Sequence, residues 1–166
     1  VLVHYLEIVE ALHEELAALS SEELAAYRVR RRDNLTKWAV SYLRRNSEAT
    51  VVQMLKAAMK RRYSIDPDAS FMTGGGEHRF GNVVEIESED GEEVGEVFLS
   101  VRDAFRVSAN LPFVRMMSDI VNYHITRLPE NKADILEDPE DPRRAEYLDR
   151  FAVQDARKYV RRSYDR

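Results

Sequence analysis

The feature that most constrains the fold is an apolar stripe near the start of the chain. Six apolar side chains follow one another at alternating steps of three and four residues: Leu2, Tyr5, Val9, Leu12, Leu16 and Leu19. This spacing keeps all of them on one face of an α-helix. The stripe therefore predicts an amphipathic helix over residues 2–19, which must bury this face against another element.

A second helix is predicted to begin at Ser20, because Ser20 and Glu23 have the spacing of a capping box. Its stripe continues at helical spacing through Leu24, Tyr27, Arg31, Leu35, Trp38 and Tyr42. The connection between the two helices is short, so they should form an antiparallel hairpin. A third helix is expected after a cap at Asn46 or Ser47, and it should stop by Ile65 because Asp66 and Pro67 follow. Its expected inner face is formed by Val51, Leu55, Ala58, Met59 and Arg62.

The middle of the chain is predicted to form a loop and then a small sheet. Residues 66–76 are polar and rich in glycine, which is typical of a connector. Beyond them, apolar residues recur at every second position around a turn at Asp90 and Gly91. The expected strand residues are Phe80, Val84 and Ile86, then Val97, Leu99 and Val101, with Phe105, Val107 and Ala109 as a possible third strand. This pattern predicts an antiparallel hairpin or a three-stranded meander.

Two more helices are expected in the last part of the chain. Asn110 should cap the first, with Pro112 in its first turn and Pro129 at its end. Its expected inner face is formed by Phe113, Met116, Met117, Ile120, Val121, His124 and Leu128. An acidic loop with three prolines follows at 129–142, and the last helix begins near Arg143. We therefore expect the α+β class in a single domain, 1–166, with three subregions: helical 1–65, loop and antiparallel β 66–110, and helical 111–166.

The charged residues are sorted into blocks of one sign, although the formal net charge of the chain is only −5. Residues 28–62 carry eleven Lys or Arg against two acids, a balance of +9. Residues 63–101 carry ten acids against one Arg, a balance of −9. Blocks of equal size and opposite sign favour either internal pairing of opposite faces or head-to-tail contact between copies.

Within the basic block, Arg31 falls inside the predicted apolar stripe. A buried guanidinium is costly unless it is paired, so Arg31 requires an anionic partner. One interpretation is an ion pair across the helical hairpin with an acid of the first helix, namely Glu7, Glu10 or Glu14. The other is that basic side chains hold the phosphates of a nucleic acid while Trp38 or Tyr42 stacks on a base. The candidate nucleic-acid-binding residues are Arg28, Arg31, Arg32, Trp38, Lys56, Lys60, Arg61 and Arg62.

No catalytic, cofactor or metal motif stands out in the chain. There is no cysteine, which excludes thiol nucleophiles and thiolate metal sites. Glu10 and His13 have the spacing found in carboxylate-bridged helical bundles, but no second such pair accompanies them. Glu85 and Glu87 have no lysine beside them, as a metal-dependent nuclease would require. The glycines at 74–76 are not followed by the Lys-Ser or Lys-Thr pair of a phosphate-binding loop.

The sequence thus favours a non-catalytic, nucleic-acid-associated binding protein without metal or cofactor. The alternative is a self-assembling structural or adaptor subunit, in which an acidic hairpin docks on the basic face of a neighbouring copy. The candidate assembly residues are Glu85, Glu87, Glu92 and Glu93. Because no run of about 18 apolar residues is present and the start of the chain lacks a signal-peptide pattern, we expect a soluble, intracellular and cytoplasmic protein.

Overall fold

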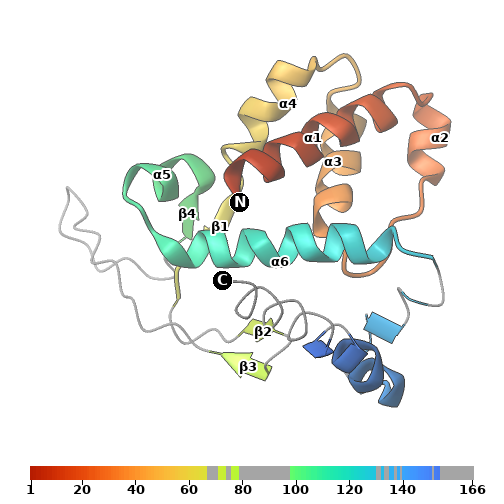
Figure 1. Ribbon diagram of the computed structural model, residues 1–166. Coiled ribbons are helices and arrows are strands. Elements are labelled where there is room, and N and C mark those ends of the chain that lie inside the picture. The colour runs from red at the N-terminus through yellow and green to blue at the C-terminus, as the bar shows by residue number, and fades with distance from the viewer. Residues whose placement is uncertain are drawn as a thin grey trace, which may run out of the picture. The chain divides into compact units, whose positions relative to one another are not determined.

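The protein has an α+β fold in which helices predominate, which confirms the predicted class (Figure 1). The computed structural model describes the following residues: 1–66, 71–73, 76–78, 98–129, 132, 135–136, 138, 140–150 and 152–153. The chain divides into two compact units, Val1–His124 and Ile125–Arg166. That the chain forms a single domain stays a prediction.

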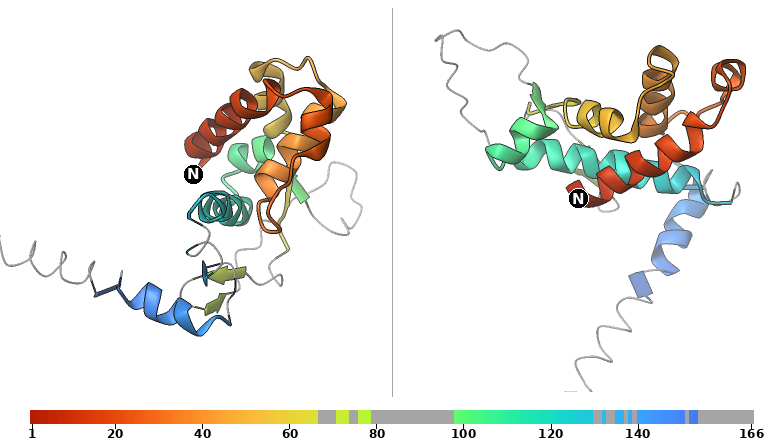
Figure 2. Two further views of the ribbon diagram at one scale, coloured as in Figure 1. Left: turned by 90° about the vertical axis from the view of Figure 1, so that its right-hand side faces the viewer. Right: turned by 90° about the horizontal axis from the view of Figure 1, so that it is seen from above.

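Helix α1 (Leu2–Ala17) confirms the first predicted helix. Its buried side chains follow the predicted stripe, with Ile8 added beside it: Tyr5, Ile8, Val9, Leu12 and Leu16. They form one hydrophobic cluster with side chains from α3 (Asn34–Arg45), α4 (Val51–Ala58) and α6 (Asn110–Thr126). Figures 1 and 2 show α6 beside α1 and the start of α3, so the core of the first unit lies between these helices.

The second predicted helix is divided in two, so the prediction of one continuous helix through Tyr42 is wrong. Helix α2 (Ser21–Ala26) does begin at the predicted capping box, where the Glu23 N–H donates to Ser20 Oγ at 3.2 Å. After Ala26 the chain leaves the helix, and α3 begins only at Asn34. Residues 27–33 therefore connect two separate helices.

Asp33 explains the break, because its side chain caps α3. Its carboxylate accepts a hydrogen bond from the Thr36 N–H at 3.0 Å and another from the Thr36 hydroxyl at 2.6 Å. The backbone of a capping residue is not helical, and Asp33 has φ −81° and ψ 79°. Asp33 is also only 3% exposed, so the cap is built into the core.

The third predicted helix is confirmed in α4, but it ends earlier than expected. Thr50, rather than Asn46 or Ser47, caps it, and Gln53 completes the capping box. The helix stops at Ala58, and Arg62–Ser64 forms strand β1, which pairs antiparallel with β4 (Phe98–Ser100). Beyond the helix, the Met59 carbonyl accepts the Arg102 N–H at 3.0 Å and the Arg61 carbonyl accepts the Val101 N–H at 2.9 Å, so neither carbonyl serves a longer helix.

The predicted third strand at Phe105, Val107 and Ala109 is wrong. Ser100 caps a short helix, α5 (Val101–Arg106), by accepting the Asp103 N–H at 3.0 Å. The apolar alternation was misleading, since Phe105 and Val107 are 60% and 52% exposed. The buried side chains of α5, Val101 and Ala104, have helical spacing instead.

The loop predicted at 66–76 contains strand β2 (Phe71–Thr73), which pairs antiparallel with β3 (Gly76–His78). The other predicted strand positions from Phe80 to Val97, and the turn at Asp90 and Gly91, lie outside the described residues. The sheet expected there is therefore tested only at β4.

Helix α6 confirms the helix predicted after Asn110, with a different inner face. Its buried residues are Leu111, Pro112, Met116, Asp119, Ile120 and Tyr123, whereas Met117 and Val121 are exposed. In the second unit, residues 142–150 are helical, which confirms the helix predicted near Arg143. Among the described helices, none is long and apolar enough to cross a membrane.

The role of Asp33 leads to a first prediction. Asp33→Ala removes the cap of α3, so the free energy of unfolding should fall by about 1–2 kcal/mol. Asp33→Asn keeps an oxygen that can accept the Thr36 N–H, so it should lose less. Urea denaturation followed by circular dichroism measures both changes. Equal losses in the two variants would contradict the capping role.

Candidate functional site

The most distinctive polar feature of the first unit is a buried carboxylate on α6. Asp119 Oδ1 accepts a hydrogen bond from Asn34 Nδ2 at 3.1 Å. Its Oδ2 accepts from Arg61 Nη2 at 3.1 Å and from the Tyr63 hydroxyl at 2.8 Å. One side chain thus ties α6 to the start of α3, to the turn after α4 and to β1.

Arg61 and Asp119 form a buried ion pair, with side chains only 15% and 9% exposed. The Arg61 guanidinium carbon lies 5.9, 5.4 and 5.2 Å from the ring centres of Tyr5, Trp38 and Tyr63. Arg61 Nη1 also donates to the Tyr5 hydroxyl at 3.4 Å, and this hydroxyl donates to the Ala58 carbonyl at 3.1 Å. The aromatic faces and the carboxylate together compensate for the loss of water around the cation.

The two tyrosines of this cluster keep their protons. Burial raises the pKa of Tyr5 and the pKa of Tyr63 above the ordinary value of 10.0 for a phenol. Both hydroxyls are therefore neutral donors at physiological pH, as their hydrogen bonds to Ala58 and Asp119 require. Two neutral tyrosines thus surround one charge pair.

Most cations of the predicted nucleic-acid site lie on the surface. The exposed members are Arg28, Arg31, Arg32, Lys56, Lys60 and Arg62. Arg62 lies along β4, where Nη2 donates to the Phe98 carbonyl at 3.1 Å. The other five form no ion pair with any residue of the described chain. The surface therefore carries positive charge that no carboxylate of the described residues neutralises by an ion pair.

The prediction that Arg31 is buried and paired across a helical hairpin is wrong. Arg31 is exposed, and within the described part of the chain it has no ion pair with Glu7, Glu10 or Glu14. The reason is the break before α3, which takes Arg31 out of the helical stripe. Only its carbonyl is engaged, as an acceptor for Lys37 Nζ.

Two members of the predicted nucleic-acid site are engaged inside the unit. Arg61 is held by Asp119, and Trp38 is partly buried against the core. The Trp38 ring contacts the Arg61 guanidinium, and it stacks on Tyr42 with 5.7 Å between ring centres. The signal that would have located this cluster is Asp119 itself, an acid among the buried positions of an apolar helix face.

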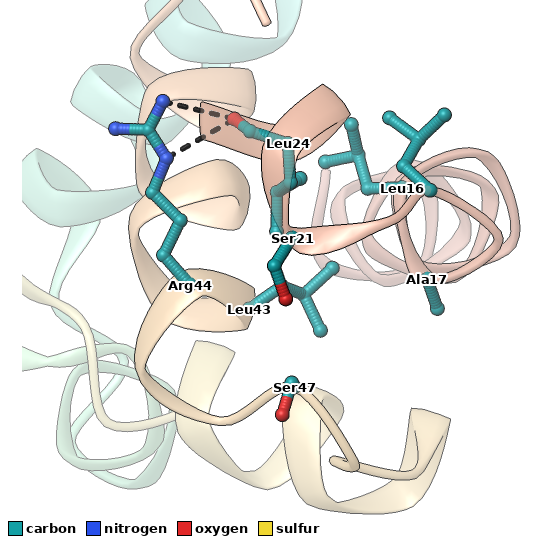
Figure 3. Close-up of a pocket in the computed structure, with 8 residues that line it drawn as sticks. Leu16, Ala17, Ser21, Leu24, Leu43, Arg44 and Ser47 are labelled. Atoms are coloured by element: carbon teal, nitrogen blue, oxygen red, sulfur yellow. Dashed lines mark hydrogen bonds between the residues drawn. The ribbon is translucent and has the colours of Figure 1, made fainter. Parts of the chain in front are cut away.

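A small pocket lies where α2 meets α1 and α3 (Figure 3). Its volume is about 80 Å³, and it is lined by Leu16, Ala17, Leu19, Ser21, Leu24, Leu43, Arg44 and Ser47. Arg44 donates to the Leu24 carbonyl from Nε and Nη2, at 3.1 and 2.9 Å, and so holds the end of α2 against α3. Ligand pockets usually measure about 300–1,000 Å³, so this one is too small for a nucleotide or an organic cofactor.

The remaining predicted sites give no catalytic centre. Glu85, Glu87, Glu92 and Glu93 lie outside the described residues. His13 is partly buried and its Nε2 contacts the Ala49 carbonyl at 2.7 Å, so it has a structural role. Within the described ranges, no three side chains with metal-binding groups come together. The basic surface beside the buried cluster is thus the strongest candidate site.

The Arg61–Asp119 pair can be tested by a double-mutant cycle. Arg61→Met or Asp119→Leu alone leaves the other charge buried without its partner, so each should lower the free energy of unfolding by about 3–5 kcal/mol. The double variant Arg61→Met/Asp119→Leu should lose clearly less than the sum of the two. Additive losses in urea denaturation would show that the two side chains do not form a coupled buried pair.

Comparisons with protein-family models, with curated proteins and with solved structures found no match to this chain. The function must therefore be argued from the chemistry of the chain itself. The two features that carry this argument are the buried Arg61–Asp119 pair and the exposed cations that form no ion pair within the described residues.

Proposed function

We propose that the protein is a non-catalytic binding protein that holds the phosphate backbone of a nucleic acid on its basic surface. The observation that supports this proposal is a set of exposed cations that have no ion pair within the described residues: Arg28, Arg31, Arg32, Lys56 and Lys60. Unpaired cations cost free energy when they are crowded together, and a polyanion relieves that repulsion.

The buried cluster draws the two ends of the basic block together. Asn34 and Arg61 are 27 positions apart in the sequence, yet both donate to the carboxylate of Asp119. One step along the chain spans about 3.8 Å, so the Cα of Arg32 lies within about 8 Å of Asn34, and that of Lys60 within about 4 Å of Arg61. The exposed cations Arg32 and Lys60 therefore lie close in sequence to two donors of one buried carboxylate, although they are far apart in the chain.

Lys56 extends this surface along α4. Lys56 is in the last turn of α4, Lys60 is in the turn that follows the helix, and both side chains are exposed. Several exposed cations suit the repeated phosphates of a nucleic-acid backbone better than a single small anion. The proposed ligand is thus a polymer.

The state of Trp38 argues against base stacking as part of this function. Its ring is partly buried and already contacts Arg61 and Tyr42, whereas single-stranded nucleic acids stack on exposed aromatic rings. Binding would then depend on phosphate contacts, which do not distinguish one base sequence from another. We therefore propose association that is weakly selective and strongly dependent on salt.

Oligonucleotide binding at several salt concentrations tests the proposal. If each of the five cations neutralises one phosphate of duplex DNA, the logarithm of the association constant should fall with the logarithm of salt with a slope of about −4 to −5. The triple variant Arg28→Gln/Arg32→Gln/Lys60→Gln should reduce the magnitude of this slope by about 2–3.

The matched control removes three cations that are already paired with carboxylates, Arg106→Gln/Arg143→Gln/Arg150→Gln. It changes the net charge equally, so it separates the proposed surface from a general charge effect. Undetectable binding at low salt, or equal losses in the two triple variants, would contradict the proposal.

Self-assembly remains the second candidate function. The observation that favours it is an exposed apolar pair on α6, because Met117 and Val121 are 43% and 45% exposed and lie one turn apart. If copies associate, the mass in solution should rise with protein concentration, and Met117→Glu/Val121→Glu should reverse that rise. Analytical ultracentrifugation measures this, and a strictly monomeric mass at high concentration and low salt would exclude self-assembly.

A further inference from the structure

Two histidines from opposite ends of the first unit meet edge to edge. The Nε2 atoms of His4 on α1 and His124 on α6 are 2.8 Å apart, and the ring planes differ by only 6°. The ring centres are 5.0 Å apart, and the two nitrogens are 2.8 Å apart. The difference is close to the sum of the two distances from a ring centre to its Nε2 atom, so both nitrogens lie near the line that joins the centres. The two Nε2 atoms therefore point at each other in nearly the same plane.

Each ring is oriented by a neighbour on its own helix. His4 Nδ1 lies 3.0 Å from Glu7 Oε2, and an ionised carboxylate can only accept, so in the neutral ring the His4 proton is on Nδ1 and Nε2 carries a lone pair. Tyr123 packs against His124 edge to face, with ring centres 5.2 Å apart. A carboxylate on the far nitrogen of an imidazole is the arrangement that orients histidine ligands in metal sites.

We propose that His4 and His124 form a surface site for a transition-metal ion, which both Nε2 atoms bind in place of the hydrogen bond between them. Imidazole nitrogens are ligands of Zn²⁺, Cu²⁺ and Ni²⁺, whereas Mg²⁺ and Ca²⁺ prefer oxygen. The described residues bring no third metal-binding side chain to the pair, so water completes the coordination. The ion would link the start of α1 to the end of α6.

The spacing of the nitrogens is close to what such an ion requires. Two imidazoles at about 2.0–2.1 Å from a tetrahedral Zn²⁺ have their nitrogens about 3.4 Å apart. The observed 2.8 Å must therefore open by about 0.6 Å, and because the two nitrogens face each other, both rings must also turn so that their lone pairs converge on the ion. The His4 side chain is 50% exposed and so has room for it.

Zn²⁺ titration of the full chain tests the site. Calorimetry should give one ion per chain, and NMR of the histidine ring nitrogens should show shifts at His4 and His124 but not at His13, whose Nε2 is held by the Ala49 carbonyl. Cu²⁺ should bind more tightly than Zn²⁺ or Ni²⁺, and excess Mg²⁺ should not compete.

Variants separate the two ligands from the positioning residue. His4→Asn and His124→Asn should each abolish saturable Zn²⁺ binding, Glu7→Ala should weaken it by about tenfold, and His13→Asn should leave it unchanged. Circular dichroism checks that each variant is folded. Absence of saturable binding up to about 1 mM Zn²⁺, ring shifts confined to other histidines, or binding that survives His4→Asn would overturn the proposal.

Discussion

The fold of the first unit depends on a single buried carboxylate. Asp119 can lie on the inner face of α6 only because Asn34, Arg61 and Tyr63 all donate to it. A buried charge pair loses its contacts with water. The attraction between the two charges offsets this free-energy cost only when every hydrogen-bond partner is in place. We infer that the network contributes mainly by fixing how α3, β1 and α6 meet, while the apolar cluster supplies most of the driving force.

The same network decides which charges face the solvent. It holds Arg61 inside and leaves Arg32 and Lys60, the cations nearest to its two donors in sequence, exposed and without ion pairs among the described residues. Cations near both ends of a run of 35 positions thus belong to segments that meet at one buried carboxylate. Nucleic-acid association is proposed on this ground, and it needs neither a deep pocket nor an open aromatic ring.

Local patterns predicted the elements of this fold better than their ends. The α1 stripe and the Ser20 capping box were sufficient because both depend on neighbours in sequence. The prediction of one helix through Tyr42 failed because Asp33 is an N-cap that interrupts the helical pattern. The strand predicted at Phe105 failed because a short helix there imitates the two-residue alternation of a strand. Asp119 marks a buried acid on α6, but its partners Asn34 and Arg61 could not be derived, since they meet it only after helices far apart in sequence have packed.

The central claim is that the Arg61 guanidinium is buried and held by Asp119. NMR measurement of hydrogen exchange at arginine side chains tests it most directly, because buried and hydrogen-bonded guanidinium protons exchange slowly. The account predicts that the Arg61 protons exchange far more slowly than those of the exposed Arg31 and Arg32, and that Asp119→Asn removes most of this protection. Equal exchange rates at Arg61 and Arg31 in the unmodified protein would contradict it.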